Sequence, residues 1–266
     1  MLYSYAVVYK LFALLFLPRL LLFFSSPRHS SSLTINPVAA VKIQFTKKSK
    51  MAQVPVRGLE ADINKFQGPL VTITVGRREE RFYVHKSLIC ASSLFFNRAL
   101  SGPWKESEEH TVALPEDDPR IFALYTHWLY AGQIPVIVPT PTMKEVAVNN
   151  TREQYHLAKA YVLGDKLLDV EFQNSTIQAI VEKADTNGFS RYPDSRSISY
   201  AYDNTTESAK IRKLFVDIYV EILPRNLNKG FPEEFLYSVV EGLMKKKLSP
   251  PRPIEASDYF LDPSGC

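Results

Sequence analysis

Histidine and cysteine side chains bind most protein metals and act as common nucleophiles and bases, and here they are scattered along the chain. They are His29, His85, His110, His127 and His156, with Cys90 and Cys266. Zinc ligands come in short spacings such as Cys-x-x-Cys or H-E-x-x-H, and neither string occurs. The sequence therefore predicts no metal site. Two cysteines also cannot build a disulfide framework, which favours a reducing compartment.

Strings that bind phosphate or expose a nucleophile are also absent. The sequence contains no G-x-x-x-x-G-K, no G-x-G-x-x-G and no G-x-S-x-G. Cys90 falls in an apolar helical pattern, where a buried, inert thiol is the usual outcome. We therefore expect no cofactor and no enzymatic activity.

The distribution of charge argues against nucleic acid binding by the body of the chain. The formal net charge is +4, but residues 1–50 hold seven of the 32 basic residues and no acidic one. The remaining 25 basic residues face 28 acidic ones, so residues 51–266 carry about −3. A slightly acidic globule has no basic surface for phosphate backbones.

Residues 1–50 form a leader that is first apolar and then basic. Residues 2–24 are mostly apolar, but Lys10 and the pair Pro18-Arg19 divide them into pieces shorter than the roughly 20 residues of a membrane span. Two interpretations stay open: a non-native or unstructured leader, and a targeting segment. We expect a cytoplasmic or nuclear protein, with membrane association through residues 2–24 as the alternative if the leader is retained.

The body begins with a strand pattern and then changes to a helical one. The β-branched run 71–75 and the run 80–84 flank a charged turn, which predicts a hairpin. Apolar residues recur at helical spacing over 87–100 around Ser92 and Ser93, which predicts two short helices or one broken helix, with either serine as a cap.

Turn and cap residues mark the next elements. Residues 111–114 predict a short strand, and Asp118 is placed to cap a helix over 121–130 that ends at Gly132. Residues 133–150 contain three prolines and little periodicity, so we expect a loop or insertion there.

The rest of the chain is predicted to be mainly helical. A polar, turn-rich stretch is expected at 184–205, and strands followed by helices favour an α+β fold over a parallel, doubly wound sheet. The expected helices span about 151–167, 172–183, 206–223 and 232–248.

Several motifs, in the same order along the chain, resemble the BTB (POZ) family. They are Phe82-Tyr83-Val84-His85-Lys86-Ser87-Leu88, Ser92-Ser93-Leu94-Phe95-Phe96, Leu114-Pro115-Glu116-Asp117-Asp118-Pro119, Trp128-Leu129-Tyr130-Ala131-Gly132 and the stretch 157–167. A weaker resemblance, in Tyr202-Asp203-Asn204-Thr205 and Leu214-Phe215-Val216-Asp217, links the C-terminal part to BTB-only proteins common in filamentous fungi.

The resemblance implies an α+β fold, the BTB/POZ fold, with a small mixed sheet, a cluster of helical hairpins and a C-terminal helical extension. The expected organisation is a leader at 1–50, a BTB/POZ domain at 66–183, a helical extension at 184–248 and a disordered, proline-rich tail at 249–266.

Most motif residues are interpreted as determinants of the fold. Large apolar side chains suit one core and stabilise it by roughly 1.5 to 3 kcal/mol each when fully buried. The resemblance implies that a ring nitrogen of His85 satisfies a backbone group, while Tyr130 could lie in the core or on the surface. The apolar set is Phe82, Val84, Leu88, Phe95, Phe96, Trp128 and Leu129.

Lys86 departs from the family pattern. Many BTB homodimers place an aspartate at the start of the first strand to pair with this basic residue, and here Gly68-Pro69-Leu70 stands there. Because an unpaired buried charge is strongly penalised, we expect Lys86 to be exposed or paired elsewhere. The homodimer therefore stays an open question.

The resemblance implies a non-enzymatic module that binds proteins: itself, other BTB domains, or the cullin scaffold of a ubiquitin ligase. Ligase adaptors of the family carry a hydrophobic-x-Glu pattern before the second sheet segment, and Trp104-Lys105-Glu106 matches it. We predict that Trp104 and Glu106 bind a partner, because aromatic anchors dominate binding hot spots. The alternative is that Trp104 folds back onto the core.

Two other functions stay open at this point. One is a transcription or chromatin-associated regulator that acts through BTB homo- or hetero-oligomers. The other is a membrane-anchored scaffold that uses residues 2–24.

Overall fold

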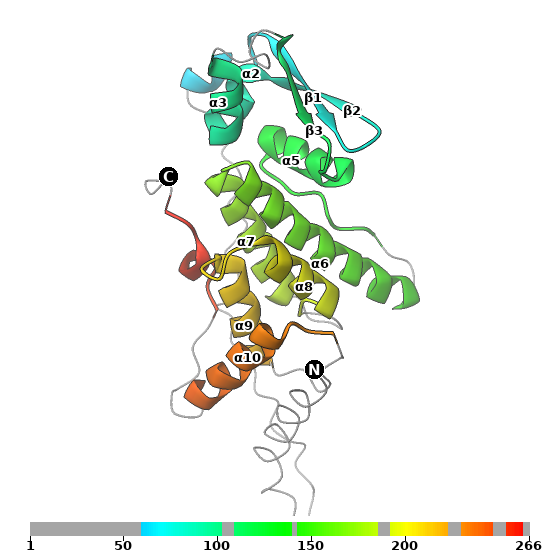
Figure 1. The fold of residues 1–266 in the computed structure, drawn as a ribbon, viewed down its shortest axis with the longest axis vertical. Helices are drawn as coiled ribbons and strands as arrows, with labels where there is room; N and C mark the ends of the chain where they lie inside the picture. The colour runs from blue at the N-terminus through cyan, green and yellow to red at the C-terminus, as the bar shows by residue number, and fades with distance from the viewer. Residues whose placement is uncertain are drawn as a thin grey trace, which may run out of the picture.

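The computed structural model describes residues 60–102, 109–139, 143–185, 192–222, 230–246 and 254–262. A module of short strands and helices lies at one end of the molecule, and longer helices extend away from it (Figure 1). Within the described ranges, no helix is both long and apolar enough to cross a membrane. Residues 1–50, with the predicted leader, lie outside them.

The sheet described in the structure has three strands, β1 (Leu70–Val75), β2 (Glu80–His85) and β3 (Thr111–Leu114). Their order is β2-β1-β3, with β1 antiparallel to β2 and parallel to β3. The predicted hairpin and third strand are confirmed. At the hairpin turn Gly76 has a φ of +75°, and a Cβ there would lie 2.9 Å from Cγ of Pro119, so only glycine fits without strain.

Side chains of β1 alternate between two faces, as a strand requires. Val71, Ile73 and Val75 have no exposed surface. They belong to a core that also holds Phe122 and Tyr125 of helix α5 (Pro119–Ala131). The opposite face, which carries Leu70, is not covered by a helix in this way (Figure 1).

The predicted break between two short helices falls where the serines stand. Helix α2 (Lys86–Ser92) and helix α3 (Leu94–Ser101) are separated by Ser93, whose Oγ accepts a hydrogen bond from the N–H of Phe96. The caps of α5 also follow the sequence: Asp118 accepts from the N–H of Arg120, and Gly132 ends the helix in the left-handed conformation.

Helix α6 (Met143–Lys166) begins earlier than predicted and precedes helix α7 (Val170–Asp185). The sequence indicated a loop over residues 133–150, whereas residues 143–150 are helical. Val148 there is 69% exposed. An exposed valine adds nothing to a buried apolar stripe, so hydrophobic periodicity does not reveal the helix at this position.

Helix α8 (Ser195–Asn204) lies inside the stretch predicted to be polar and turn-rich. Its N-cap is Asp194, whose Oδ1 accepts from the N–H of Ser197 at 2.9 Å. It buries only a narrow stripe that includes Ile198 and Ala201, so its composition resembles that of a loop. Helices α9 (Lys210–Ile222) and α10 (Glu233–Lys246) lie within their predicted ranges.

The tail also differs from the expectation of disorder, over residues 254–262. They include the short 3-10 helix η3 (Ala256–Tyr259), in which Ala256 and Tyr259 are buried. The prolines that suggested disorder flank this stretch and do not interrupt it. Tyr259, Ala256 and the partly buried Ile254 pack this segment against the helices.

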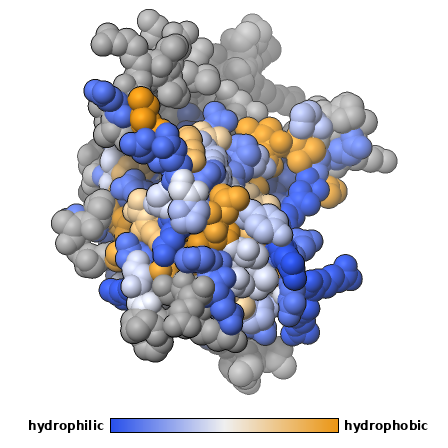
Figure 2. All heavy atoms as spheres, turned by 90° about the horizontal axis from the view of Figure 1, so that it is seen from above, coloured by the Kyte–Doolittle hydropathy of each residue, from blue (hydrophilic) through white to orange (hydrophobic). Residues whose placement is uncertain are grey.

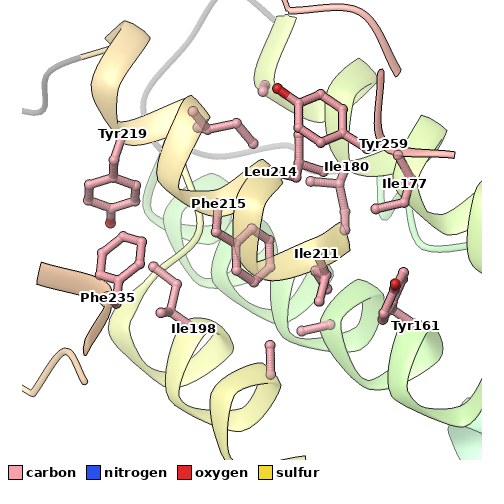
Figure 3. Close-up of a cluster of buried hydrophobic side chains, with 14 of the residues drawn as sticks. Tyr161, Ile177, Ile180, Ile198, Ile211, Leu214, Phe215, Tyr219, Phe235 and Tyr259 are labelled. Atoms are coloured by element: carbon pink, nitrogen blue, oxygen red, sulfur yellow. The ribbon is translucent and has the colours of Figure 1, made fainter. Parts of the chain in front are cut away.

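The buried side chains of the described residues form two clusters that meet on α6. Ala160 and Leu163 of α6 pack with the sheet, α2, α3 and α5. Leu157, Ala158 and Tyr161 of the same helix pack with α7 to α10 and η3. Figure 3 shows this second cluster, with Tyr161 opposite side chains from α7 and α9. Helix α6 therefore fixes the C-terminal helices to the N-terminal module.

Candidate functional site

The apolar motif residues lie in or against the first of these clusters. Val84, Leu88, Phe96 and Leu129 are buried members of it. The other three, Phe82, Phe95 and Trp128, are partly buried and pack against it. Phe82 meets Phe122 edge to face at 4.9 Å between ring centroids, a favourable aromatic geometry. These side chains build the support on which exposed residues are held.

His85 and Tyr130 form a hydrogen-bonded pair at the edge of the sheet. Nδ1 of His85 lies 2.7 Å from the Tyr130 hydroxyl, and the backbone N–H of His85 donates to the same oxygen at 3.1 Å. One hydroxyl oxygen of Tyr130 thus contacts both the backbone N–H and the ring of His85. The partner of Nδ1 is therefore the side chain of Tyr130, whereas the resemblance implied a backbone group as the partner of a ring nitrogen.

Exposed apolar side chains surround this pair, and we call Phe66, Leu70, Tyr83 and Tyr130 the sheet-edge patch. The ring of Phe66 stacks on that of Tyr130, with 5.5 Å between centroids. Leu70 pairs with His85 across β1 and β2, and Tyr83 stands two residues before His85 on the same face.

The sheet-edge patch is open to solvent, with exposed fractions from 38% for Tyr130 to 59% for Tyr83. Figure 2 looks onto this end of the molecule and shows hydrophobic side chains among hydrophilic ones. Exposed aromatic side chains on a rigid support are suited to binding another protein.

Asp169 is a buried carboxylate that sequence reasoning missed. Its Oδ1 accepts from the N–H of Phe172 at 2.9 Å, and its Oδ2 accepts from Ser92 Oγ at 2.5 Å and the Tyr125 hydroxyl at 2.8 Å. Burial raises the pKa of the Asp169 carboxyl and raises that of Tyr125 well above its ordinary value. The sequence offers one local signal for Asp169, because it lies three residues before Phe172 and can cap the helix there. Its partners on α2 and α5 are distant in sequence, so no local pattern predicts them.

Cys90 of α2 is a free cysteine within the described residues. Burial raises the pKa of the Cys90 thiol, although the charge of Lys86 opposes this. A thiol with a raised pKa is a weak nucleophile. Among the residues that the structure describes, no group of three or more His, Cys, Asp or Glu side chains could hold a metal ion.

Comparison with known families decides which module this is. Residues 66–157 match the BTB/POZ domain family. The chain contains a BTB/POZ domain. Its three-stranded mixed sheet and surrounding helices agree with the α+β fold expected from the motifs. BTB domains are protein-protein interaction modules, so the family assignment agrees with the binding chemistry of the surface.

A curated relative is similar to part of this chain. The chain is 31% identical over 91 residues to "Kelch-like protein 26" from Danio rerio. The match covers 34% of this chain and 14% of that protein. The chain therefore spans only a small part of the length of this relative.

Lys86 lies at the edge of the BTB domain in a half-buried position. Its backbone N–H donates to the carbonyl of Pro69 at 3.0 Å. Among the described residues no carboxylate forms an ion pair with its ammonium group. The backbone bond to Pro69 does not involve the ammonium group, and Gly68-Pro69-Leu70 has no carboxylate to pair with it.

Trp104 and Glu106 lie outside the described residues, between the end of α3 at Ser101 and the start of β3 at Thr111. Their role in partner binding stays a prediction from the motif. The same holds for an anchor formed by residues 2–24.

Proposed function

We propose that this protein is an adaptor that binds a cullin scaffold through its BTB domain and holds a second protein on its C-terminal helices. The observation that carries the proposal is the use of α6 by both buried clusters. A protein bound by α7 to α10 would be kept at a fixed position relative to the BTB domain. A fixed geometry is useful to an adaptor because effective concentration depends on linker length and stiffness.

Trp104 and Glu106 are the proposed contacts with the cullin. An aromatic anchor and a carboxylate two residues apart supply an apolar contact and a hydrogen-bond acceptor, the combination found at binding hot spots. The family pattern of hydrophobic-x-Glu supports this role.

The test is co-precipitation of the full chain with a cullin after the double substitution Trp104→Ala and Glu106→Ala. We expect loss of the cullin with an unchanged circular dichroism spectrum. Tyr237→Ala is the matched control, because Tyr237 is a highly exposed aromatic residue on α10. Cullin capture that survives the double substitution contradicts the proposal.

The sheet-edge patch favours a second function, association with another BTB domain, which could serve a transcription or chromatin-associated regulator. Phe66, Leu70 and Tyr83 are apolar and exposed, and side chains of this kind are enriched in the centres of protein interfaces. Association buries them at the edge that carries Lys86.

Light scattering at tens of micromolar tests this association. The expected result is a dimer for the wild type and a monomer for Tyr83→Glu, with Tyr237→Glu as the control that leaves the mass unchanged. A wild-type monomer at these concentrations removes the oligomer from consideration and leaves the adaptor proposal standing.

A further inference from the structure

Residues 254–262, here called the C-terminal strap, lie against helices α7 and α9 (Figure 1). Tyr259 is only 3% exposed, and Figure 3 shows its ring beside Leu214 of α9 and Ile180 and Ile177 of α7. The next residue, Phe260, is exposed. The strap is therefore seated by few side chains, with Tyr259 as the largest.

Asn174 of α7 binds the main chain of the strap. Its Nδ2 donates to the carbonyl of Leu261 at 3.2 Å, and its Oδ1 accepts from the Leu261 N–H at 2.8 Å. This paired contact recognises an extended backbone whatever its side chain, as the neighbouring strand of a sheet does. Asparagine is a poor helix former, and recognition of a backbone explains its position within α7.

The buried tyrosine ring also has polar partners. The Tyr259 hydroxyl donates to Oδ2 of Asp217 at 2.7 Å. Nζ of Lys213 lies 4.8 Å from the centre of the ring and pairs with the same carboxylate. The cation near the ring favours an aromatic side chain, and the acceptor for the hydroxyl favours tyrosine over phenylalanine at this position.

We propose that the surface formed by α7 and α9 is a peptide-binding groove that the strap occupies within the same chain. Its ligand in other proteins is an extended segment with a tyrosine two residues before the amide that Asn174 binds. Acidic residues flank this motif in the ligand, as Asp258 and Asp262 do in the strap. The groove thus recognises one side chain and one backbone unit, the usual basis of short-motif binding. This inference does not depend on what the BTB domain binds.

The strap can leave the groove without unfolding the protein. It follows α10 through residues 247–253, and besides its own 3-10 helix η3 it contributes no helix and no strand to the fold. Segments that bury few apolar contacts open with much lower free energy than the global fold. Because a tethered segment acts at a high effective concentration, a free peptide binds the intact chain weakly until the strap is weakened.

The experiment uses the full chain and a fluorescent peptide with the sequence of residues 253–263. Leu261→Pro removes the N–H that donates to Asn174, so it weakens the strap and leaves the groove unchanged. Fluorescence anisotropy should show roughly tenfold tighter peptide binding to this variant than to the wild type. Tyr259→Ser is a second strap variant with the same expected direction.

Two controls separate groove binding from unspecific capture. Adding Asn174→Ala to the Leu261→Pro chain should abolish binding, and a peptide with phenylalanine in place of Tyr259 should bind more weakly. For the wild-type chain, excess peptide should accelerate amide exchange in residues 254–262 and leave α9 (Lys210–Ile222) protected. Because the exchange experiment uses the wild-type chain, it tests the proposal even where a strap variant fails to fold.

Three results overturn the proposal. The first is equal peptide binding by the wild type and both strap variants, and the second is binding that persists after Asn174→Ala. The third is strap-dependent pairing of two differently tagged copies of the full chain, which assigns the groove to a second copy and not to another protein.

Discussion

At the scale of single residues, the Asp169 carboxylate connects three helices that the sequence separates widely. It accepts hydrogen bonds from Ser92 at the end of α2, from Tyr125 of α5 and from the N–H of Phe172 in α7. The donors compensate part of the cost of burying a carboxylate, and its pKa is still raised by burial. The stability of the protein should therefore depend on which side chain replaces Asp169.

Asp169→Ala and Asp169→Asn should differ in their effect on stability. Alanine leaves three buried donors without an acceptor, so we expect the free energy of unfolding to fall by roughly 2 to 4 kcal/mol. Asparagine keeps an acceptor for the Phe172 N–H, and hydroxyls can rotate to face its amide, so its loss should be less than half as large. Urea unfolding measures the loss of stability in both variants. Equal losses contradict the role of Asp169 as a buried acceptor.

The raised pKa of Asp169 also predicts the sign of a pH effect. The folded protein holds this proton more tightly than the unfolded chain, so its contribution to stability is present below the unfolded pKa and is lost as pH rises through the folded pKa. Asp169→Asn lacks this titration. The free energy of unfolding of the wild type, relative to Asp169→Asn, should therefore increase as pH falls toward about 4. A pH-independent difference in urea unfolding contradicts this.

At the scale of elements, helices α6 and α7 approach closely at a glycine. A Cβ on Gly164 would lie 2.8 Å from Cγ of Gln173 and 3.1 Å from Cδ1 of Phe172, both of them buried residues. Elsewhere in a helix, glycine to alanine gains about 0.5 to 1 kcal/mol. Here the close approach of the helices reverses the sign.

Gly164→Ala should therefore lower the free energy of unfolding by roughly 1 to 3 kcal/mol. The double variant Gly164→Ala with Gln173→Ala removes the closest atom, so its loss should be smaller than the sum of the two single losses. Strictly additive losses in thermal or urea unfolding contradict a direct clash at this site.

At the scale of the whole molecule, the BTB domain and the C-terminal helices should unfold together because α6 supplies buried residues to both clusters. Leu214 of α9 is fully buried in the second cluster, and Trp128 packs against the first. Leu214→Ala should cost about 2 to 5 kcal/mol and shift the unfolding transition reported by Trp128 fluorescence.

The unfolding transition seen by circular dichroism is compared with that seen by fluorescence. Trp104→Phe is introduced into both the wild type and Leu214→Ala, so that Trp128 is the sole tryptophan. Coincident transitions that move together in Leu214→Ala support one cooperative unit. A fluorescence transition that stays in place shows two units that unfold independently, and the fixed geometry proposed for the adaptor then fails.

The sequence by itself determined the elements whose signals are local. The hairpin, a cap at Ser92 or Ser93, the cap at Asp118 and the end at Gly132 follow from strand periodicity and from side-chain oxygens or glycine at fixed places. The structure contains each of them, with Ser93 as the first cap. These interactions span a few residues, so they are visible in order along the chain.

The tertiary structure alone decided what depends on distant partners. The start of α6 carries the exposed Val148, α8 buries only a narrow stripe among polar residues, and η3 is held by α7 and α9, far away in sequence. The bond between His85 and Tyr130 and the three donors to Asp169 likewise join separate segments. Burial and hydrogen bonding of this kind depend on which surfaces meet, and a linear pattern does not contain that information.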